Sequence, residues 1–195
     1  MRLLVLAMTV LLLALPAQAA SLTLGKPGYG GTGCPGGSAS VSLSRDGKSL
    51  TLRFTRYAVS AGGSTGKTFD RKSCNLAIPV SVPSGKSVSI LSIDFVGYNS
   101  LPSSAKSEFR VEYFLAGGRG PVLTRGFNGP KQGTFKTSDK LTAKSVVWSA
   151  CGADVTLRTN SSLKVTTSGG RAASASIESQ KVKSAIVFHL QLRDC

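Results

Sequence analysis

Few side chains of this chain are suited to acid–base or nucleophilic chemistry. The sequence holds a single histidine, His189, and nine Asp or Glu residues scattered along 195 residues. His189 occupies a polar position in an alternating stretch, so we expect a solvated surface side chain. Serines are abundant, and they leave a serine triad open as a chemical possibility, although we expect no nucleophile elbow of the Gly-x-Ser-x-Gly kind.

Asp94 stands out among the acidic residues because it lies within the apolar stretch 90–96. This position predicts a buried carboxylate, which needs a hydrogen-bonding or charged partner. We expect Asp94 to accept structural hydrogen bonds, and the alternative is that it belongs to a functional site. A polysaccharide hydrolase would need a second acid, such as Glu108 or Asp154, opposite it in a cleft. The same activity could instead pair Asp94 with His189.

Residues 61–68 (Ala-Gly-Gly-Ser-Thr-Gly-Lys-Thr) fit a relaxed phosphate-binding loop, with Ala61 where glycine is usual. Such a loop follows a strand and opens a helix, whose N-terminus and lysine neutralise the phosphate. Residues 69–74, which follow it, show no helical periodicity. We therefore predict a flexible Gly/Ser loop, with no bound nucleotide and no cofactor.

The four cysteines, Cys34, Cys74, Cys151 and Cys195, contain no close pair of the kind that zinc sites use. Their even number in an exported chain predicts two disulfides and no metal site. Four cysteines allow three pairings. We expect Cys34–Cys74 and Cys151–Cys195, because sequential pairing would tie down the N-terminal loops and fix the C-terminal strand. Trp148, which precedes Cys151, is expected to pack in the core against a disulfide.

The N-terminus has the layout of a secretory signal peptide. A basic residue, Arg2, precedes the apolar stretch 3–16, and Ala17-Gln18-Ala19 offers a small-x-small cleavage site. The apolar stretch is shorter than the ~20 residues of a membrane-spanning helix, and no later stretch is apolar enough to cross a bilayer. We predict a signal peptide at 1–19, one domain at 20–195, and a protein secreted to the extracellular space or the periplasm.

Short stretches that alternate apolar and polar residues dominate the rest of the chain, and turn-forming residues separate them. Period-two alternation is what a half-buried strand requires. Strands are expected at 39–44, 50–54, 76–82, 88–96, 109–113, 122–127, 134–137, 145–148, 155–159, 163–166, 172–178 and 186–192. The step Asp46-Gly47 favours a hairpin between the first two. This pattern predicts an all-β fold, an antiparallel β-sandwich or jelly roll with little or no helix after the signal peptide.

The surroundings of the cysteines resemble a known family. The segments concerned are 31–38, 71–76, 94–98 and 148–153, together with the terminal Cys195. In that order they resemble the secreted four-cysteine proteins of bacteria and fungi grouped as domain-of-unknown-function family 4360, over about residues 30–195. The resemblance implies a secreted β-rich domain with four structural cysteines. It implies no activity, and this chain is more basic than the family leads one to expect.

Positive charge is the strongest compositional signal. Lys and Arg number 24 against nine Asp and Glu, and the formal net charge of +15 becomes +14 once Arg2 is removed. A hydrophobic fraction of 41% excludes a disordered basic tail. Such a charge attracts polyanions, including anionic glycans, cell-wall polymers, lipopolysaccharide and extracellular DNA. Five basic residues at polar positions of expected strands are the candidate contacts: Arg53, Arg110, Arg158, Lys164 and Arg193.

The same charge could simply keep a secreted protein soluble. We predict a non-catalytic extracellular or envelope-associated module that binds a polyanionic or carbohydrate ligand. A hydrolase of polysaccharide or another envelope polymer is one alternative, and a structural or protein-interaction module is the other.

Overall fold

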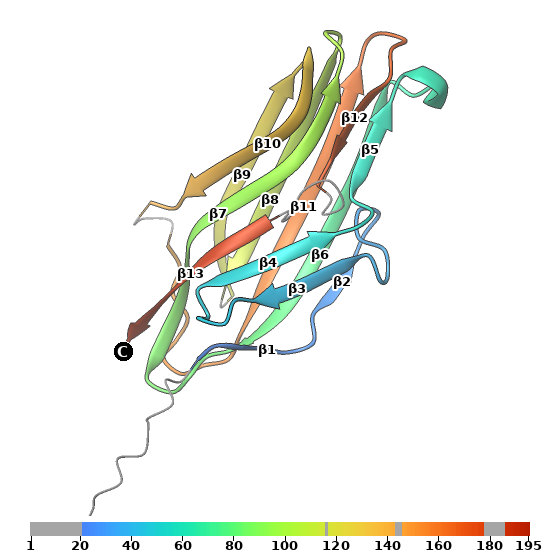
Figure 1. The fold of residues 1–195 in the computed structure, drawn as a ribbon. Coiled ribbons are helices and arrows are strands. Elements are labelled where there is room, and N and C mark those ends of the chain that lie inside the picture. Colours follow the sequence, from blue (N-terminus) through green and yellow to red (C-terminus); the bar gives the residue numbers. More distant parts are fainter. Residues whose placement is uncertain (1–20, 116, 143–145, 178–185) are drawn as a thin grey trace, which may run out of the picture.

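The computed structural model describes residues 21–115, 117–142, 146–177 and 186–195. The predicted signal peptide lies outside these residues. The described chain is a sandwich of two antiparallel sheets (Figure 1), which confirms the predicted fold class. One 3₁₀ turn, η1 at Gly63–Thr65, is the helical element of the described part. No helix there is long and apolar enough to span a membrane.

Sheet A has six strands in the order β1-β6-β11-β8-β9, and β2 also pairs with β6. Its strands are β1 Thr23–Leu24, β2 Gly28–Gly30, β6 Phe69–Ser81, β8 Ala105–Leu115, β9 Gly118–Asn128 and β11 Val155–Thr167. Sheet B has seven strands in the order β3-β4-β13-β7-β12-β5, and β10 pairs with the other side of β7. Its strands are β3 Ala39–Leu43, β4 Ser49–Phe54, β5 Ala58–Ala61, β7 Lys86–Leu101, β10 Lys131–Lys140, β12 Ala173–Ser176 and β13 Ile186–Asp194. In Figure 1 sheet B lies in front of sheet A.

The core lies between the sheets because each strand buries alternate residues. Four aromatic rings, Phe54, Tyr57, Phe109 and Phe95, form a chain of edge-to-face contacts across the core. Their successive ring centroids are 5.3, 6.5 and 5.2 Å apart. All four side chains are buried, and full burial of a side chain of this kind stabilises a fold by ~1.5–3 kcal/mol. The aromatic chain therefore joins β4 and β7 of one sheet to β8 of the other.

The strands expected at 155–159 and 163–166 are one continuous strand, β11. The polar stretch 160–162, which suggested a break, stays in the sheet because Ser161 is satisfied inside the core. Its hydroxyl donates to the carbonyl of Cys74 at 3.1 Å and accepts from the hydroxyl of Tyr57 at 3.0 Å. Burial raises the pKa of Tyr57 well above its usual value of 10, so this hydroxyl is a neutral donor at physiological pH.

Other boundaries also differ from the prediction. β6 and β7 are longer than the expected 76–82 and 88–96. The strand expected at 145–148 is not formed in the described part, where Trp148 makes only an isolated bridge to Ser89. Residues 145 and 178, which end two of the expected strands, lie outside the described residues. The predicted hairpin at Asp46-Gly47 does join β3 to β4, and Gly47 has the positive φ of 70° that this turn needs.

Both predicted disulfides are present. Cys34 is bonded to Cys74 and Cys151 to Cys195, with Cα atoms 5.3 and 5.9 Å apart. The first bond fixes the N-terminal Gly-rich loop to β6. The second joins the loop that precedes β11 to the last residue of the chain, just beyond β13. Each bridge stabilises the fold by roughly 2–5 kcal/mol, because it restricts the unfolded chain.

The Tyr57–Ser161 contact gives a test of the core. Ser161→Ala should lower the free energy of unfolding by about 1–3 kcal/mol, because it leaves the Tyr57 hydroxyl buried without a partner. Thr159→Val is the matched control on the same side of the same strand. The Thr159 hydroxyl is buried and has no partner among the described residues, so its removal should not destabilise the protein.

Urea unfolding of the two variants measures this difference. In a Tyr57→Phe background the loss caused by Ser161→Ala should shrink, since no tyrosine hydroxyl is then left unpaired. Equal losses for Ser161→Ala and Thr159→Val would show that the hydroxyl contact does not stabilise β11.

Candidate functional site

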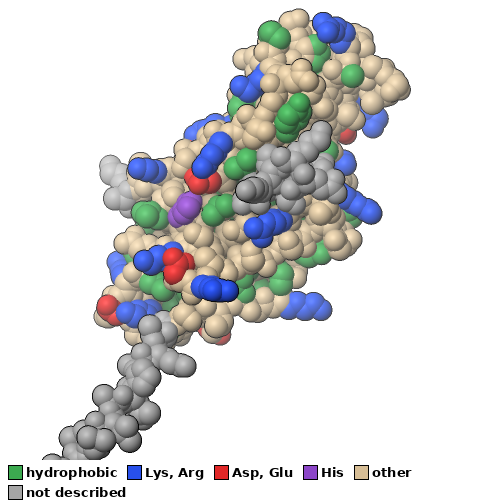
Figure 2. Space-filling view, viewed as in Figure 1, with side chains coloured by type: hydrophobic (Ala, Val, Ile, Leu, Met, Phe, Trp, Pro, Cys, Tyr) green, Lys and Arg blue, Asp and Glu red, His purple; other side chains and the backbone are tan. Residues whose placement is uncertain are grey.

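Two of the five candidate basic residues, Arg53 and Arg193, lie on the outer side of sheet B. The register of β4 and β13 places them roughly 25 Å apart along the strands. Figure 2 shows this side of the molecule, where Lys and Arg side chains are spread among other residues rather than gathered in one patch. The structure does not bring these two arginines together.

Asp94 also points outward from sheet B, although its apolar surroundings predicted burial in the core. A β-bulge is the reason. The pairing of β13 with β7 shifts between His189 and Leu190, and Leu91 of β7 is left exposed beside the shift. Beyond the bulge Ile93 and Phe95 face the core, so Asp94 between them does not, and its side chain is 19% exposed.

Asp94 and His189 meet on this surface. Nε2 of His189 lies 3.1 Å from Oδ2 of Asp94, and Ser138 of β10 hydrogen-bonds to the same carboxyl group. Partial burial raises the pKa of Asp94, but the hydrogen bonds from Ser138 and His189 and the positive charges of His189 and Lys136 outweigh it. Together these neighbours hold the pKa of Asp94 below its usual value of 3.8, so the carboxylate is ionised at neutral pH.

The order of these groups does not suit nucleophilic catalysis. In a Ser-His-Asp triad the histidine lies between the other two and takes the proton of the serine. Here Asp94 contacts both Ser138 and His189, so the carboxylate occupies the middle position. Glu108 faces outward from sheet A, so the whole core separates it from Asp94. The two carboxylates therefore do not face each other across a cleft. We interpret Asp94 as an electrostatic link that joins β7 to β10 and β13.

The Gly/Ser loop at 61–68 does not form a phosphate-binding loop. The single turn η1 follows β5, and the strand β6 begins at Phe69 where that motif needs a helix. Residues 62–66 do have the spacing Gly-x-Ser-x-Gly of a hydrolase nucleophile, contrary to the expectation from the sequence. That motif needs a strand, a tight turn and a helix, whereas this serine lies between two strands.

The other three candidates, Arg110, Arg158 and Lys164, share the outer side of sheet A. Arg110 belongs to β8, and Arg158 and Lys164 belong to the neighbouring strand β11. Three more basic residues point outward from the same sheet. They were not singled out from the sequence, because only the strand order shows which basic residues are neighbours. We call these six residues the basic face: Arg71, Lys106, Arg110, Arg119, Arg158 and Lys164.

Only two acidic residues, Glu108 and Glu112, lie among the described side chains of the basic face. Glu108 Oε1 accepts from Nζ of Lys164 at 2.9 Å. Glu112 Oε1 lies 2.6 Å from Nε of Arg119, and its other oxygen lies 3.8 Å from Arg110.

The remaining basic residues of this face, Arg71, Lys106 and Arg158, form no ion pair with a described Asp or Glu. Small polar side chains lie between the charges. Ser162 of β11 is paired with Ser73 on one side and with Arg110 on the other. The face therefore offers both positive charge and hydroxyl groups.

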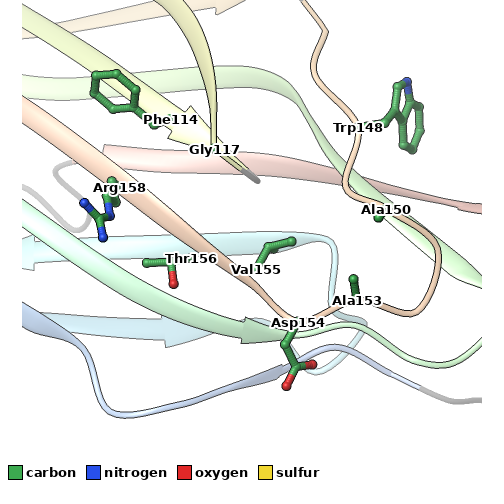
Figure 3. A pocket seen from close by; sticks show the side chains of 9 residues that line it. All are labelled: Phe114, Gly117, Trp148, Ala150, Ala153, Asp154, Val155, Thr156 and Arg158. Carbon is green, nitrogen blue, oxygen red and sulfur yellow. The ribbon is translucent and has the colours of Figure 1, made fainter.

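A hollow of about 570 Å³ lies where β11 begins, and we call it the end hollow. Figure 3 shows Phe114 and Arg158 on one side of the hollow and Trp148 on the opposite side. Asp154 lies at its lower edge in this view. Short side chains, such as Thr156, lie between them. Arg158 is cross-strand to Phe114 and also belongs to the basic face, so the face and the hollow adjoin.

Trp148 is half-buried at the rim of the end hollow rather than packed in the core as expected. The guanidinium of Arg193 lies 4.1 Å from the centroid of the Trp148 ring. This candidate arginine therefore packs on the indole. The residues that follow are held firmly. Ser149 donates its amide to the carbonyl of Val88 and its Oγ accepts from the amide of Val88. With the Cys151–Cys195 bond, these contacts fix the wall of the hollow.

Comparison with known proteins identifies a family. The pattern of the family described as "Domain of unknown function (DUF4360)" matches residues 20–195. A protein of Arthroderma benhamiae named "Uncharacterized secreted protein" is 34% identical over 139 residues. That match covers 71% of this chain and 57% of the fungal protein, so this chain corresponds to little more than half of its relative.

Solved structures that match this chain at low similarity include carbohydrate-binding modules. TmCBM61 in complex with β-1,4-galactotriose matches with a TM-score of 0.29 and 12% identity, over 87% of this chain and 88% of that one. The family 11 carbohydrate-binding module of Clostridium thermocellum matches with a TM-score of 0.21 and 11% identity, over 89% and 88%. Overlaps this loose say nothing about what the present chain binds.

The charge of Asp94 predicts a pH-dependent stability. Asp94→Asn should lower the free energy of unfolding near about pH 7, because the ionised carboxylate is favoured by its neighbours in the folded state. A depressed folded-state pKa stabilises the protein above the unfolded-state pKa. That stabilisation is lost as the pH falls through the lower folded-state value.

Urea unfolding from about pH 7 down to about pH 3 measures the effect. The free energies of unfolding of wild type and Asp94→Asn should converge in acid. Ser138→Ala removes one hydrogen bond to Asp94, so its loss of stability relative to wild type should depend on pH in the same direction but less strongly. A difference between wild type and Asp94→Asn that stays constant down to acid pH would contradict this assignment.

Proposed function

The chain belongs to the DUF4360 family of secreted proteins, and we propose that it is a non-catalytic binding module for an anionic polysaccharide held on the basic face. The observation that carries the proposal is the grouping of six Lys and Arg residues on one side of sheet A, against two Glu residues. The secretory context supports a polymer of the cell surface or of the surroundings as the ligand.

The dimensions of the face favour an extended ligand. Arg158 and Lys164 lie six residues apart on β11, roughly 20 Å at the usual rise of a strand. A small anion could contact one of them but not both. Arg71 and Arg110 flank β11 on its two sides, so a chain of carboxylate or sulfate groups lying along this strand would meet charges throughout its length.

The polar residues of the face suit a sugar backbone. Ser73, Asn160 and Ser162 place hydroxyl and amide groups among the charges, and these can exchange hydrogen bonds with sugar hydroxyls. Arg71, Lys106 and Arg158 lack a described acidic partner, so an incoming anion need not displace one. A module of this kind needs no catalytic group.

Retention on immobilised heparin, eluted with a salt gradient, tests the proposal. The wild-type mature protein should bind at ~50 mM salt and elute well before ~1 M, because the contacts are ionic. The double variant Arg71→Glu/Lys106→Glu should elute at clearly lower salt. It should unfold at nearly the wild-type urea concentration, since exposed charges contribute little to stability.

The matched control is Arg45→Glu/Lys140→Glu, which makes the same change in net charge through exposed residues outside the basic face. It should elute close to wild type. Equal weakening in both double variants would mean that total charge, and not this face, causes retention. Absence of retention on heparin and on anionic envelope fractions at low salt would overturn the proposed function.

A further inference from the structure

We infer that the end hollow is a second binding site, distinct in chemistry from the basic face, and that it takes an uncharged sugar. The basic face carries a clear excess of positive charge. The charged residues that line the hollow are one acid and one base, Asp154 and Arg158. Its volume of about 570 Å³ lies within the ~300–1,000 Å³ of small-molecule sites.

The lining combines apolar surface with polar groups. Phe114 and Trp148 are both half-buried and lie on opposite sides of the hollow (Figure 3). A sugar ring has an apolar side of C–H groups, which packs on aromatic carbon, and a circumference of hydroxyls. An ion needs no aromatic wall, and a purely apolar ligand would leave Asp154 and Arg158 without hydrogen bonds.

The polar groups have bonding capacity to spare. Oδ1 of Asp154 accepts from the hydroxyl of Ser81 at 2.7 Å and from the amide of Val82 at 3.3 Å. Its other oxygen has no described partner, so it can accept from a ligand hydroxyl. Arg158 has no described ion pair and presents several N–H donors. Asp154 and Arg158 are four residues apart in the chain, roughly 13 Å at the rise of a strand, so they suit hydroxyls at the two ends of a short sugar chain.

The wall of the hollow is set before any ligand arrives. The segment around Trp148 is fixed by the Ser149–Val88 hydrogen bonds, by a bond from Ser89 Oγ to the carbonyl of Val147 at 2.7 Å, and by the Cys151–Cys195 bond. Arg193 covers one side of the indole. A site built in this way loses little conformational freedom on binding, which favours a small ligand that makes few contacts.

Trp148 is the only tryptophan of the chain, so its fluorescence reports on the end hollow alone. The probes are glucose, galactose, mannose, xylose and N-acetylglucosamine, each as the monosaccharide and as a β-linked trisaccharide, at up to roughly 10 mM so that a site with a Kd of ~1 mM fills. At least one neutral sugar should change the emission in a saturable way. The change should be insensitive to salt, because no ion pair forms.

Two conservative variants locate the response. Phe114→Leu keeps the apolar volume but removes the flat ring, and Asp154→Asn keeps Oδ1 for Ser81 while removing the charge. Each variant should raise the dissociation constant for the sugar roughly tenfold, which is the contribution of about one strong contact. Arg71→Glu/Lys106→Glu should bind the sugar as wild type does. Asp46→Asn, an exposed residue of the β3–β4 turn, is the control for loss of one negative charge.

Absence of a saturable response to every neutral sugar would overturn the inference, and so would a response that both hollow variants leave unchanged. Heparin retention is measured on the same samples. Retention without a response to sugar would reject the hollow alone, and a response to sugar without retention would reject the basic face alone.

Discussion

The arrangement of the whole molecule depends on β11 running unbroken through the middle of sheet A. A polar stretch in a central strand would normally end it, because buried hydroxyls without partners are costly. Ser161 avoids that cost by hydrogen-bonding to the hydroxyl of Tyr57 and to the carbonyl of Cys74. Cys74 is in turn fixed by its disulfide to Cys34. One strand can therefore extend from the end hollow along the length of the basic face, with Arg158 and Lys164 on its outer side.

The sandwich separates two kinds of surface. Alternation sends most polar side chains to the outer side of their own sheet, so groups on the two outer sides cannot cooperate across the core. Asp94, His189 and Ser138 are on one outer side, where they link three strands of sheet B. The grouped positive charge is on the other. The histidine and the carboxylate that suggested an enzyme are thus remote from the surface that could hold a polymer.

Much of this could be predicted from the sequence, because the relevant signals are local. Alternation identified most strands, Asp46-Gly47 the first hairpin, and the even number of cysteines in an exported chain the two disulfides. Strand order is not local, and it alone decides that Arg71 joins Arg110 and Lys164 while Arg53 does not. Asp94 was placed wrongly because the bulge beside Leu91 inverts the alternation of β7, and the neighbouring apolar residues conceal that inversion. The continuity of β11 was missed because the partner of Ser161 is 104 residues away in the chain.

Arg158 connects the two proposed sites, since it lies at the end of the basic face and on the rim of the end hollow. A polysaccharide that carries both neutral sugars and anionic groups would contact both surfaces at once. The second contact would then be intramolecular, and its effective concentration would depend on the length of chain between the two. The fixed loop around Trp148 and the rigid strand β11 hold the two surfaces at a constant separation. Affinity would therefore depend on the spacing of charges along the polymer, a form of selectivity that neither surface could provide by itself.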